Sequence, residues 1–257
     1  MVVTRAAEQS KDLVGALERA GARAIVFPVI RIAPPEDFAA LDSALRSGAT
    51  FDWILFTSQN AVKAVRERAS QLRERADFGR AKVGVVGGAT AEEARLAGFS
   101  VTHVASHPLG RTLVDDLAEE LRGKRIFLPR SDRADPELLR ALEACRAGVT
   151  EAIAYRTIPG QRPGETAQAE IARADAVLFF SPSAVAGFFE TFGAGAKGYL
   201  GARAVAVVGP VTHAALRAAG VGDAIVADEA SVAGVVEALA HFFQQREQGA
   251  SSGAKSA

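Results

Sequence analysis

Residues 51–62 read Phe51-Asp-Trp-Ile-Leu-Phe-Thr-Ser-Gln-Asn-Ala-Val62 and join a short apolar run to a helix start. The run Ile54-Leu-Phe56 has the length of a buried strand. Ser58 is a residue type that caps helices, and the chain from Ala61 onward favours helix. The stretch therefore predicts a buried strand that leads directly into the first turn of a helix.

The same pattern returns later in the chain as Ala174-Asp-Ala-Val-Leu-Phe-Phe-Ser-Pro-Ser-Ala-Val185. Ser181 takes the position of Ser58. Pro182 stands just inside the expected helix start, where a helix accepts proline. An internal repeat of this kind decides the fold, so its extent has to be followed along the whole chain.

Two further pairs of segments extend the repeat. Gly87-x-x-Thr90 corresponds to Gly209-x-x-Thr212, in the same order along the chain. Leu-Pro-Arg130 resembles Val-Thr-Arg5, but this pair runs in the opposite order. The middle of the chain therefore holds one complete repeat unit, and the two ends hold pieces of the other in permuted order. We expect the two ends to fold together as one domain, into which the middle segment is inserted.

Strands alternate with helices throughout, which predicts parallel sheets with helices on both faces. We expect an α/β protein with two flavodoxin-like parallel-sheet domains, each with strand order 2-1-3-4-5. Ligands bind such sheets beyond the carboxyl ends of the strands, where the strand order reverses. The expected bounds are residues 1–30 plus 160–245 for domain 1, residues 36–153 for the inserted domain 2, and residues 246–257 for a disordered tail after a helix that ends near Phe243.

Two extended segments mark the crossings between the domains. Pro28, Pro34 and Pro35 exclude helix from the first crossing. The second is Arg156-Thr-Ile-Pro-Gly160. Two extended crossings at one place predict a two-stranded linker.

Charge and composition exclude several classes of protein. The 257 residues include 30 basic and 30 acidic side chains, and such a neutral chain argues against nucleic-acid binding. No apolar run approaches the ~20 residues that span a bilayer, and the chain begins directly with a strand instead of a signal peptide. A single cysteine, Cys145, fits a reducing cytoplasm. We therefore predict a cytoplasmic protein that binds neither nucleic acid nor membrane.

Small or polar residues stand at the predicted helix starts of both repeat units. Backbone N–H groups and the helix dipole attract anions there, and Arg5 and Arg130 at two further strand ends add positive charge. The other candidate binding residues are Thr57, Ser58, Gly87, Gly88, Thr90, Ser181, Pro182, Ser183, Gly209, Pro210 and Thr212. One interpretation is a cleft for a ligand with several carboxylates or phosphates. The alternative is that these residues serve the turns alone.

Other kinds of site lack their sequence patterns. Gly84-x-x-Gly87-Gly88 is not a dinucleotide fingerprint, and no Walker-type lysine follows a glycine loop. Ser58 and Ser181 lack the flanking glycines of a nucleophile elbow. The four histidines show no metal-ligand spacing. Neither a metal nor a cofactor is expected.

Tyr155 is one of two tyrosines and stands at the second crossing. It is either a packing residue of the hinge or a phenol placed for proton transfer. The residues alone leave both interpretations open.

Several short motifs occur in a fixed order along the chain. They are Val-Thr-Arg5, Phe-Thr-Ser58 with Asn60-Ala-Val, Gly87-x-x-Thr90-Ala, Leu-Pro-Arg130, Ala-Tyr155-Arg-Thr, Phe-Phe-Ser181-Pro-Ser-Ala-Val and Val-Gly209-Pro-x-Thr212. The ordered set, from about Val2 to Phe243, resembles the uroporphyrinogen-III synthase family. That resemblance implies two flavodoxin-like domains of permuted origin joined by a two-stranded linker, in agreement with the repeat.

The resemblance also implies an activity, that of a lyase in tetrapyrrole biosynthesis. It would cyclise hydroxymethylbilane, a linear tetrapyrrole octacarboxylate, to uroporphyrinogen III with loss of water and inversion of ring D. The family uses no cofactor and no metal. Tyr155 matches the family's linker tyrosine, a candidate to assist departure of the hydroxyl, and Thr212 matches the threonine after Gly-Pro. A transient contact with the preceding or following pathway enzyme is a further expectation.

The competing hypothesis is a non-catalytic cytosolic two-domain binder of a small polyanionic ligand. The neutral net charge does not separate the two hypotheses. An assay that resolves the product isomers does.

Overall fold

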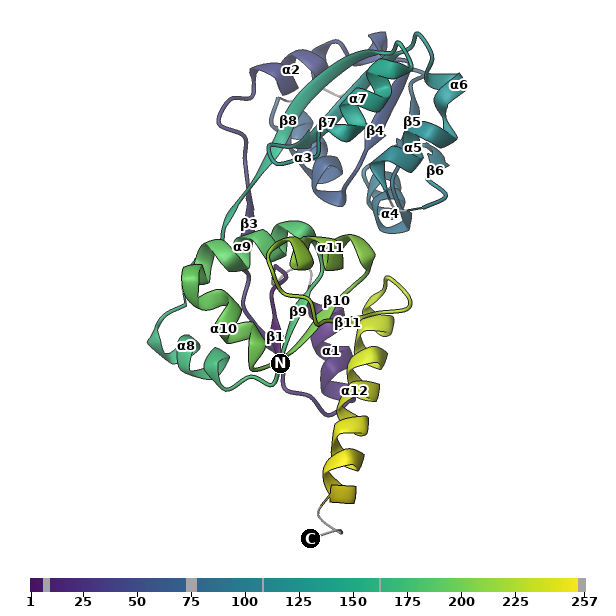
Figure 1. The fold of residues 1–257 in the computed structure, drawn as a ribbon. Helices are drawn as coiled ribbons and strands as arrows, with labels where there is room; N and C mark the ends of the chain where they lie inside the picture. Colours follow the sequence, from purple (N-terminus) through teal and green to yellow (C-terminus); the bar gives the residue numbers. More distant parts are fainter. Residues whose placement is uncertain (7–9, 73–77, 108, 162, 254–257) are drawn as a thin grey trace. The chain divides into compact units, whose positions relative to one another are not determined.

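The computed structural model describes residues 1–6, 10–72, 78–107, 109–161 and 163–253. The chain divides into two compact units, each built around one parallel-dominated sheet (Figure 1). Unit 1 consists of Met1–Arg31 and Ile158–Ala257, and unit 2 consists of Ile32–Thr157. The two ends of the chain therefore fold together, and the middle segment forms its own body.

Unit 1 contains a five-stranded sheet with strand order β11-β10-β9-β1-β2, whose paired strands are parallel. Its strands are β1 (Val2–Val3), β2 (Ile25–Val26), β9 (Ala176–Phe179), β10 (Ala204–Val207) and β11 (Ile225–Val226). All residues of β9 and β10 are buried, because helices cover both faces of the sheet. Read along the chain, this is the predicted order 2-1-3-4-5, with the reversal between β1 and β9.

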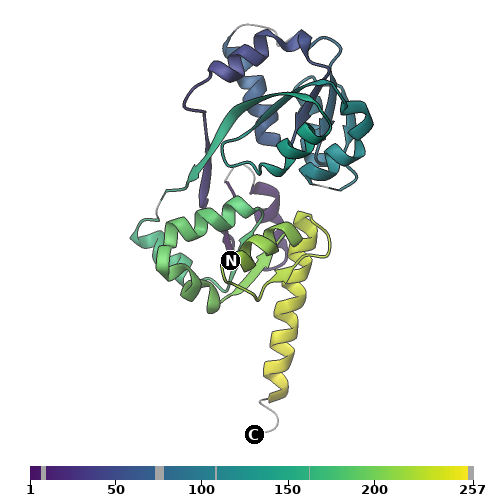
Figure 2. The same cartoon turned by 45° about the horizontal axis from the view of Figure 1, so that its top comes forward.

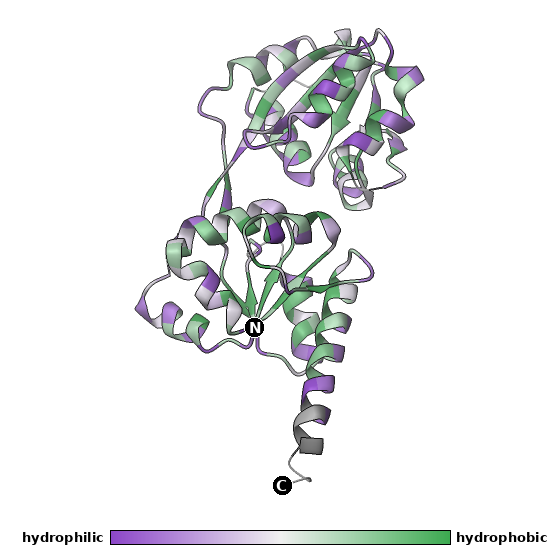
Figure 3. Cartoon of the chain, in the orientation of Figure 1, coloured by the Kyte–Doolittle hydropathy of each residue, from purple (hydrophilic) through white to green (hydrophobic). Residues whose placement is uncertain are grey.

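The helices of unit 1 enclose two apolar layers, one on each face of the sheet. Leu13 of α1 and Leu239 of α12 pack on one face, whereas Phe188 of α9 and Leu216 of α11 pack on the other. Figure 3 shows the hydrophobic strands between these helices. The helices are α1 (Lys11–Arg19), α8 (Glu165–Ala172), α9 (Pro182–Phe192), α10 (Ala196–Gly201), α11 (Pro210–Ala218) and α12 (Val232–Gly253).

Unit 2 contains a six-stranded sheet with strand order β3-β8-β7-β4-β5-β6. Its strands are β3 (Ile30–Ala33), β4 (Trp53–Phe56), β5 (Lys82–Val85), β6 (Val101–Val104), β7 (Arg125–Ser131) and β8 (Gly148–Pro159). The sequence match places β7 at the position of β1 and β8 at that of β2. Without β3, the order is therefore again 2-1-3-4-5, and the repeat is permuted as predicted.

The strand registers agree with the sequence repeat residue by residue. Val2 of β1 pairs with Val177 of β9 in unit 1. The residues at the corresponding positions of unit 2, Phe127 of β7 and Ile54 of β4, also pair. The two sheets are thus built from equivalent strands in equivalent registers.

Successive residues of β4 alternate between the two apolar layers of unit 2. Ile54 and Phe56 face the layer that includes residues of α2, α3 and α4, whereas Trp53 and Leu55 face the layer of α5 and α7. The helices are α2 (Ala39–Arg46), α3 (Gln59–Gln71), α4 (Gly88–Leu96), α5 (Gly110–Asp116), α6 (Ala118–Leu121) and α7 (Glu137–Ala144).

The two-stranded linker predicted from the prolines is present as β3 and β8, which are neighbours in one sheet (Figures 1 and 2). β8 is a single strand of 12 residues that continues from the sheet of unit 2 into the linker. At the unit 1 end, the N–H of Gly160 donates to the carbonyl oxygen of Val29 at 2.8 Å. A Cβ on Gly187 of α9 would lie 2.6 Å from the same oxygen, so the entering chain runs directly over this glycine.

The last helix ends later than the sequence suggests. A helix ending near Phe243 and a disordered tail from residue 246 were expected, but α12 runs from Val232 to Gly253. The residues Gln244-Gln-Arg-Glu-Gln248 are straight-chain types with good helix propensity, which explains the continuation. Residues 254–257 of the expected tail lie outside the described residues.

Candidate functional site

Ser58 joins β4 to α3 at the carboxyl edge of the unit 2 sheet. Its backbone is extended, with φ −158° and ψ 154°, and its side-chain oxygen accepts the N–H of Ala61 at 3.1 Å. This is the helix cap that the sequence predicts, and it satisfies one of the N–H groups that lack a partner within the helix. The Ser58 hydroxyl proton is left available for a second partner.

That second partner is Tyr155 of β8, whose hydroxyl lies 3.0 Å from the Ser58 oxygen. Tyr155 is only 9% exposed. Burial raises the pKa of the phenol, hydrogen bonds with Ser58, Ser131 and Asn60 lower it, and the charge of Asp132 raises it, with a net increase. The phenol is therefore protonated around neutral pH and can donate a hydrogen bond or a proton.

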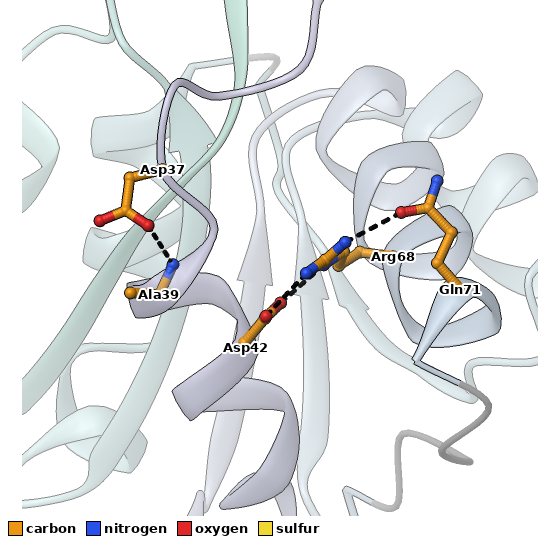
Figure 4. A network of polar contacts seen from close by, with 5 residues as sticks. All are labelled: Asp37, Ala39, Asp42, Arg68 and Gln71. Atoms are coloured by element: carbon orange, nitrogen blue, oxygen red, sulfur yellow. Dashed lines mark hydrogen bonds and ion pairs between the residues drawn. The ribbon is translucent and has the colours of Figure 1, made fainter.

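The helix that carries this cap is held in place by a polar network (Figure 4). Arg68 of α3 donates two hydrogen bonds of 2.7 Å to the carboxylate of Asp42 in α2, and a third of 3.1 Å to Gln71. Asp37 caps α2 by accepting the N–H of Ala39 at 2.8 Å. A bidentate arginine–carboxylate pair fixes orientation as well as distance. The Arg68–Asp42 pair therefore joins α2 to α3, the helix that begins at Ser58.

The glycines at the start of α4 are not explained by turn geometry. Gly87 is extended, with φ −170°, a conformation that any residue adopts. A Cβ on Gly88 would have no atom within 4 Å. Gly87 is thus not required by its backbone conformation and Gly88 is not required by packing, and the exposed Gly88 leaves the helix N-terminus accessible, which favours the anion-binding interpretation. Thr90, one turn further, is buried.

Arg130 of β7 is engaged within unit 2. It is 3% exposed. Its Nε lies 3.3 Å from Glu151 Oε1, and its NH2 group donates to the carbonyl oxygen of Asp135 at 2.6 Å. The guanidinium therefore ties β7 to β8 and to the turn before α7. Its predicted contact with a ligand stays a prediction and requires these bonds to open.

Unit 1 repeats the serine cap with a different partner. Ser181 has an extended backbone, and its side-chain oxygen accepts the N–H of Ala184 at 3.1 Å. Pro182 occupies the first position of α9, as predicted. Where Ser58 meets a tyrosine, Ser181 lies 3.2 Å from the hydroxyl of Ser183.

The start of α11 resembles that of α4. Gly209 is extended, with φ 174°, and an added Cβ would come no closer than 3.7 Å to Ala230. Pro210 follows at the first helical position, and Thr212 is 3% exposed. Gly209 is itself buried and Pro210 has no backbone N–H, so this helix N-terminus is less open than that of α4, and Thr212 is also enclosed by the fold.

The end of β1 is tied to β9 at the point where the strand order reverses. The buried hydroxyl of Thr4 donates to the carbonyl oxygen of Leu178 at 2.6 Å. The guanidinium of Arg5 lies 5.3 Å from the centre of the Phe180 ring. Burial lowers the pKa of Arg5 and Asp12 raises it, with a net decrease. Guanidinium groups remain protonated in proteins, so Arg5 supplies a positive charge at this edge.

Among the predicted site residues, the structure brings Ser58 and Tyr155 into direct contact. Thr57 precedes the same cap in the chain. Sequence reasoning missed Ser131, Asp132 and Thr157, which form hydrogen bonds with one another beside Tyr155. The available signal was Ser-Asp directly after Leu-Pro-Arg130, because these residue types bond to the main chain at the ends of strands.

The chemistry that this arrangement offers is limited and specific. A protonated phenol can assist a leaving hydroxyl group, and helix N-termini can hold carboxylates. Within the described part of the chain there is no group of three or more His, Cys, Asp or Glu residues placed to hold a metal ion. The same residues include no helix that is both long and apolar enough to cross a membrane.

Comparison with known proteins gives consistent results. Residues 11–237 match the family model described as uroporphyrinogen-III synthase HemD. The uroporphyrinogen-III synthase of Synechococcus elongatus is 31% identical over 220 residues, which cover 82% of this chain and 83% of the relative. A putative uroporphyrinogen-III synthase of Methanothermobacter thermautotrophicus is 31% identical over 255 residues, covering 93% and 97%.

Solved structures share the fold. A mutant uroporphyrinogen III synthase from Thermus thermophilus has a TM-score of 0.68 at 22% identity and covers 96% of this chain and 98% of its own. The uroporphyrinogen-III synthetase of Helicobacter pylori has a TM-score of 0.65 at 14% identity, covering 92% and 95%. At these identities the likeness concerns the fold alone.

Proposed function

This chain belongs to the uroporphyrinogen-III synthase family, and we propose that it cyclises hydroxymethylbilane to uroporphyrinogen III. The observation that carries the proposal is the pair formed by Tyr155 and Ser58, 3.0 Å apart. It places a protonated phenol beside a helix start, on the carboxyl edge where sheets of this order bind ligands.

The reaction needs an acid and a way to hold the substrate. The ring-A hydroxyl leaves as water once it accepts a proton, which produces an azafulvene cation. Ring D then attacks through its substituted carbon to form a spiro intermediate, which fragments and recloses with ring D inverted and with loss of a proton. Tyr155 is the proposed group that assists the hydroxyl, because it is protonated and buried. The protein also holds the linear tetrapyrrole in the folded orientation that ring closure needs, and this orientation accounts for the rest of the rate advantage over unassisted closure.

The carboxylates of the substrate are proposed to bind at the helix starts of the two sheets. The accessible N-terminus of α4 supports this assignment, because packing does not require the glycine at Gly88, which is exposed. Thr212 is retained as a candidate from the family resemblance, although it is buried. The remaining proposed contacts are Arg5, Thr57, Ser58, Gly87, Gly88, Thr90, Arg130, Ser181, Pro182, Ser183, Gly209 and Pro210.

The test supplies freshly prepared hydroxymethylbilane to the purified protein. The products are oxidised, and the porphyrin isomers are separated by chromatography. An excess of isomer III over the protein-free control is the expected result. Only isomer I, formed at the spontaneous rate, would overturn the proposal and leave a non-catalytic binder of a polyanion as the remaining hypothesis.

We also propose a transient contact with the enzyme that supplies hydroxymethylbilane, and a cytoplasmic location. Spontaneous closure of the substrate gives the wrong isomer, so a short transfer between enzymes limits that loss. Chemical cross-linking of the two purified proteins during turnover tests the contact, with the unrelated protein albumin as the control. Cell fractionation tests the location.

A further inference from the structure

The strand that carries Tyr155 is irregular at this residue. Arg130 of β7 pairs with Ile153 of β8, but the next residue, Ser131, pairs with Tyr155, so Ala154 has no partner in β7. Side chains of a regular strand alternate between the two faces of a sheet. Here Ala154 and Tyr155 are adjacent in sequence, yet both lie in the apolar layer that includes α3, whereas Ile153 is 43% exposed.

This bulge is what directs the phenol to Ser58. In a regular strand, Tyr155 would face the opposite layer from Ala154, away from α3. Because Ala154 is an extra residue in β8, the Tyr155 side chain faces α3, and its hydroxyl lies within hydrogen-bonding distance of the Ser58 oxygen. Bulges of this kind re-aim a side chain and are frequent next to active sites.

Asp132 holds the bulge by two bonds to β8. Its N–H donates to the carbonyl oxygen of Tyr155 at 3.2 Å, and its Oδ1 accepts the N–H of Thr157 at 2.9 Å. The carboxylate therefore acts as a main-chain acceptor would, one residue beyond the end of β7. The two bonds fix β8 immediately before and after Arg156.

The carboxylate also contacts the neighbouring hydroxyl groups. The Ser131 oxygen lies 3.0 Å from Asp132 Oδ1 and 3.2 Å from the Thr157 hydroxyl, and it also forms a hydrogen bond with Tyr155. Among the described groups that shift the pKa of Tyr155, Asp132 is the one charged group; the others are neutral side chains of α3 and of β7.

We propose that Asp132 is a positioning residue for Tyr155: it locks the bulge in β8 that directs the phenol to Ser58. The inference rests on the proposed cyclisation for its catalytic consequence. The placement of Tyr155 by Asp132 does not depend on that reaction and is measured separately.

The first readout is the absorbance of tyrosinate during an alkaline titration. The chain has two tyrosines, so the Tyr199→Phe background leaves Tyr155 alone. Asp132→Asn removes a charge that raises the pKa of Tyr155 and should move the titration to lower pH. Ser131→Ala removes a hydrogen bond that lowers the same pKa and should move the titration to higher pH.

The second readout is turnover. Asp132→Ala, which removes the acceptor of the Thr157 N–H, should lower kcat about 10- to 100-fold with little change in KM, because displacement of a catalytic group by about 1 Å has effects of that size. The matched control is Asp135→Ala, three positions along the same turn, which removes a carboxylate that accepts the N–H of Glu137 at the start of α7 at 2.8 Å. This control should change neither the tyrosinate titration nor kcat.

The outcomes separate this inference from the proposed function. An unchanged titration in Asp132→Asn together with an unchanged kcat in Asp132→Ala would overturn the positioning role. A parent protein that forms no isomer III would instead refute the proposed function, and the titration alone would then decide whether Asp132 holds the phenol. Should the Asp132 variants fail to fold, Ser131→Ala decides the question, since an unchanged tyrosinate titration in that variant contradicts the network.

Discussion

Gly187→Ala tests how the linker is seated on unit 1. Gly187 lies buried in α9 beneath the chain that enters β3. An added Cβ would sit 2.6 Å from the carbonyl oxygen of Val29 and 3.2 Å from its carbonyl carbon, and it would also strike the side chain of Ile30. The carbonyl oxygen cannot retreat freely, because it accepts the N–H of Gly160 at 2.8 Å.

The expected magnitude follows from two opposing effects. Alanine in place of glycine within a helix gains about 1 kcal/mol. Forcing an extra methyl group into a packed site costs about 1–3 kcal/mol, and a contact with backbone places this site at the upper end. The net result should be a loss of about 2 kcal/mol in the free energy of unfolding.

Urea unfolding followed by circular dichroism measures the change. The control is Gly198→Ala in α10, where an added Cβ has no atom within 4 Å. That variant should gain up to about 1 kcal/mol, because only the helix propensity changes. Equal stability of the two variants would refute the argument that the linker presses on Gly187.

Three other changes test the site and its supports. Tyr155→Phe should lower kcat about 100-fold and the free energy of unfolding by about 1 kcal/mol. The control Tyr199→Phe should keep kcat. An equal loss of turnover and of product binding in Tyr155→Phe would assign the residue to packing. Ser181→Ala should lower the free energy of unfolding by about 1 kcal/mol through loss of the α9 cap, measured by urea unfolding against Ser183→Ala, which keeps the cap and should change little. The hydrogen bond from Arg68 holds the pKa of the Asp42 carboxyl below its usual value. At pH values above the ordinary pKa of about 4, this carboxylate therefore stabilises the folded state. That stabilisation is lost as the pH falls through the lower pKa of the folded state. Urea unfolding at a series of pH values should therefore show a gap between parent and Asp42→Asn that is constant near neutrality and closes in acid, and a gap that stays open at the lowest pH would contradict the ion pair.

The strand order could be predicted because it depends on patterns that recur along the chain. The apolar run ending at Phe56 and its copy ending at Phe179 are buried strands in both sheets. The reversed match between Arg130 and Arg5 identified β7 as the counterpart of β1. The length of α12 was not foreseen, because a polar segment rich in Gln and Glu is compatible with both a helix and a tail.

The site was predicted less completely, because its contacts cross between elements. The cap at Ser58 is local and readable from residue types. The bulge at Ala154 depends on the register between two strands and leaves no mark in the sequence. The engagement of Arg130 with Glu151 depends on the same pairing. The two units also differ at the position of the phenol: counting from the matched strand pairs, Ile30 occupies the position of Tyr155 in unit 1.

The hydrogen bond between Val29 and Gly160 has a bearing on how such a chain could have arisen. These residues flank everything that belongs to the middle body, and they already touch at 2.8 Å. A middle body whose two ends leave the other unit side by side disturbs that unit little, as does a domain inserted at a surface turn. Read along the chain, the equivalent strands run 1-2, then 3-4-5-1-2 in the middle body, then 3-4-5, which is the order left by a tandem duplication of one five-stranded unit.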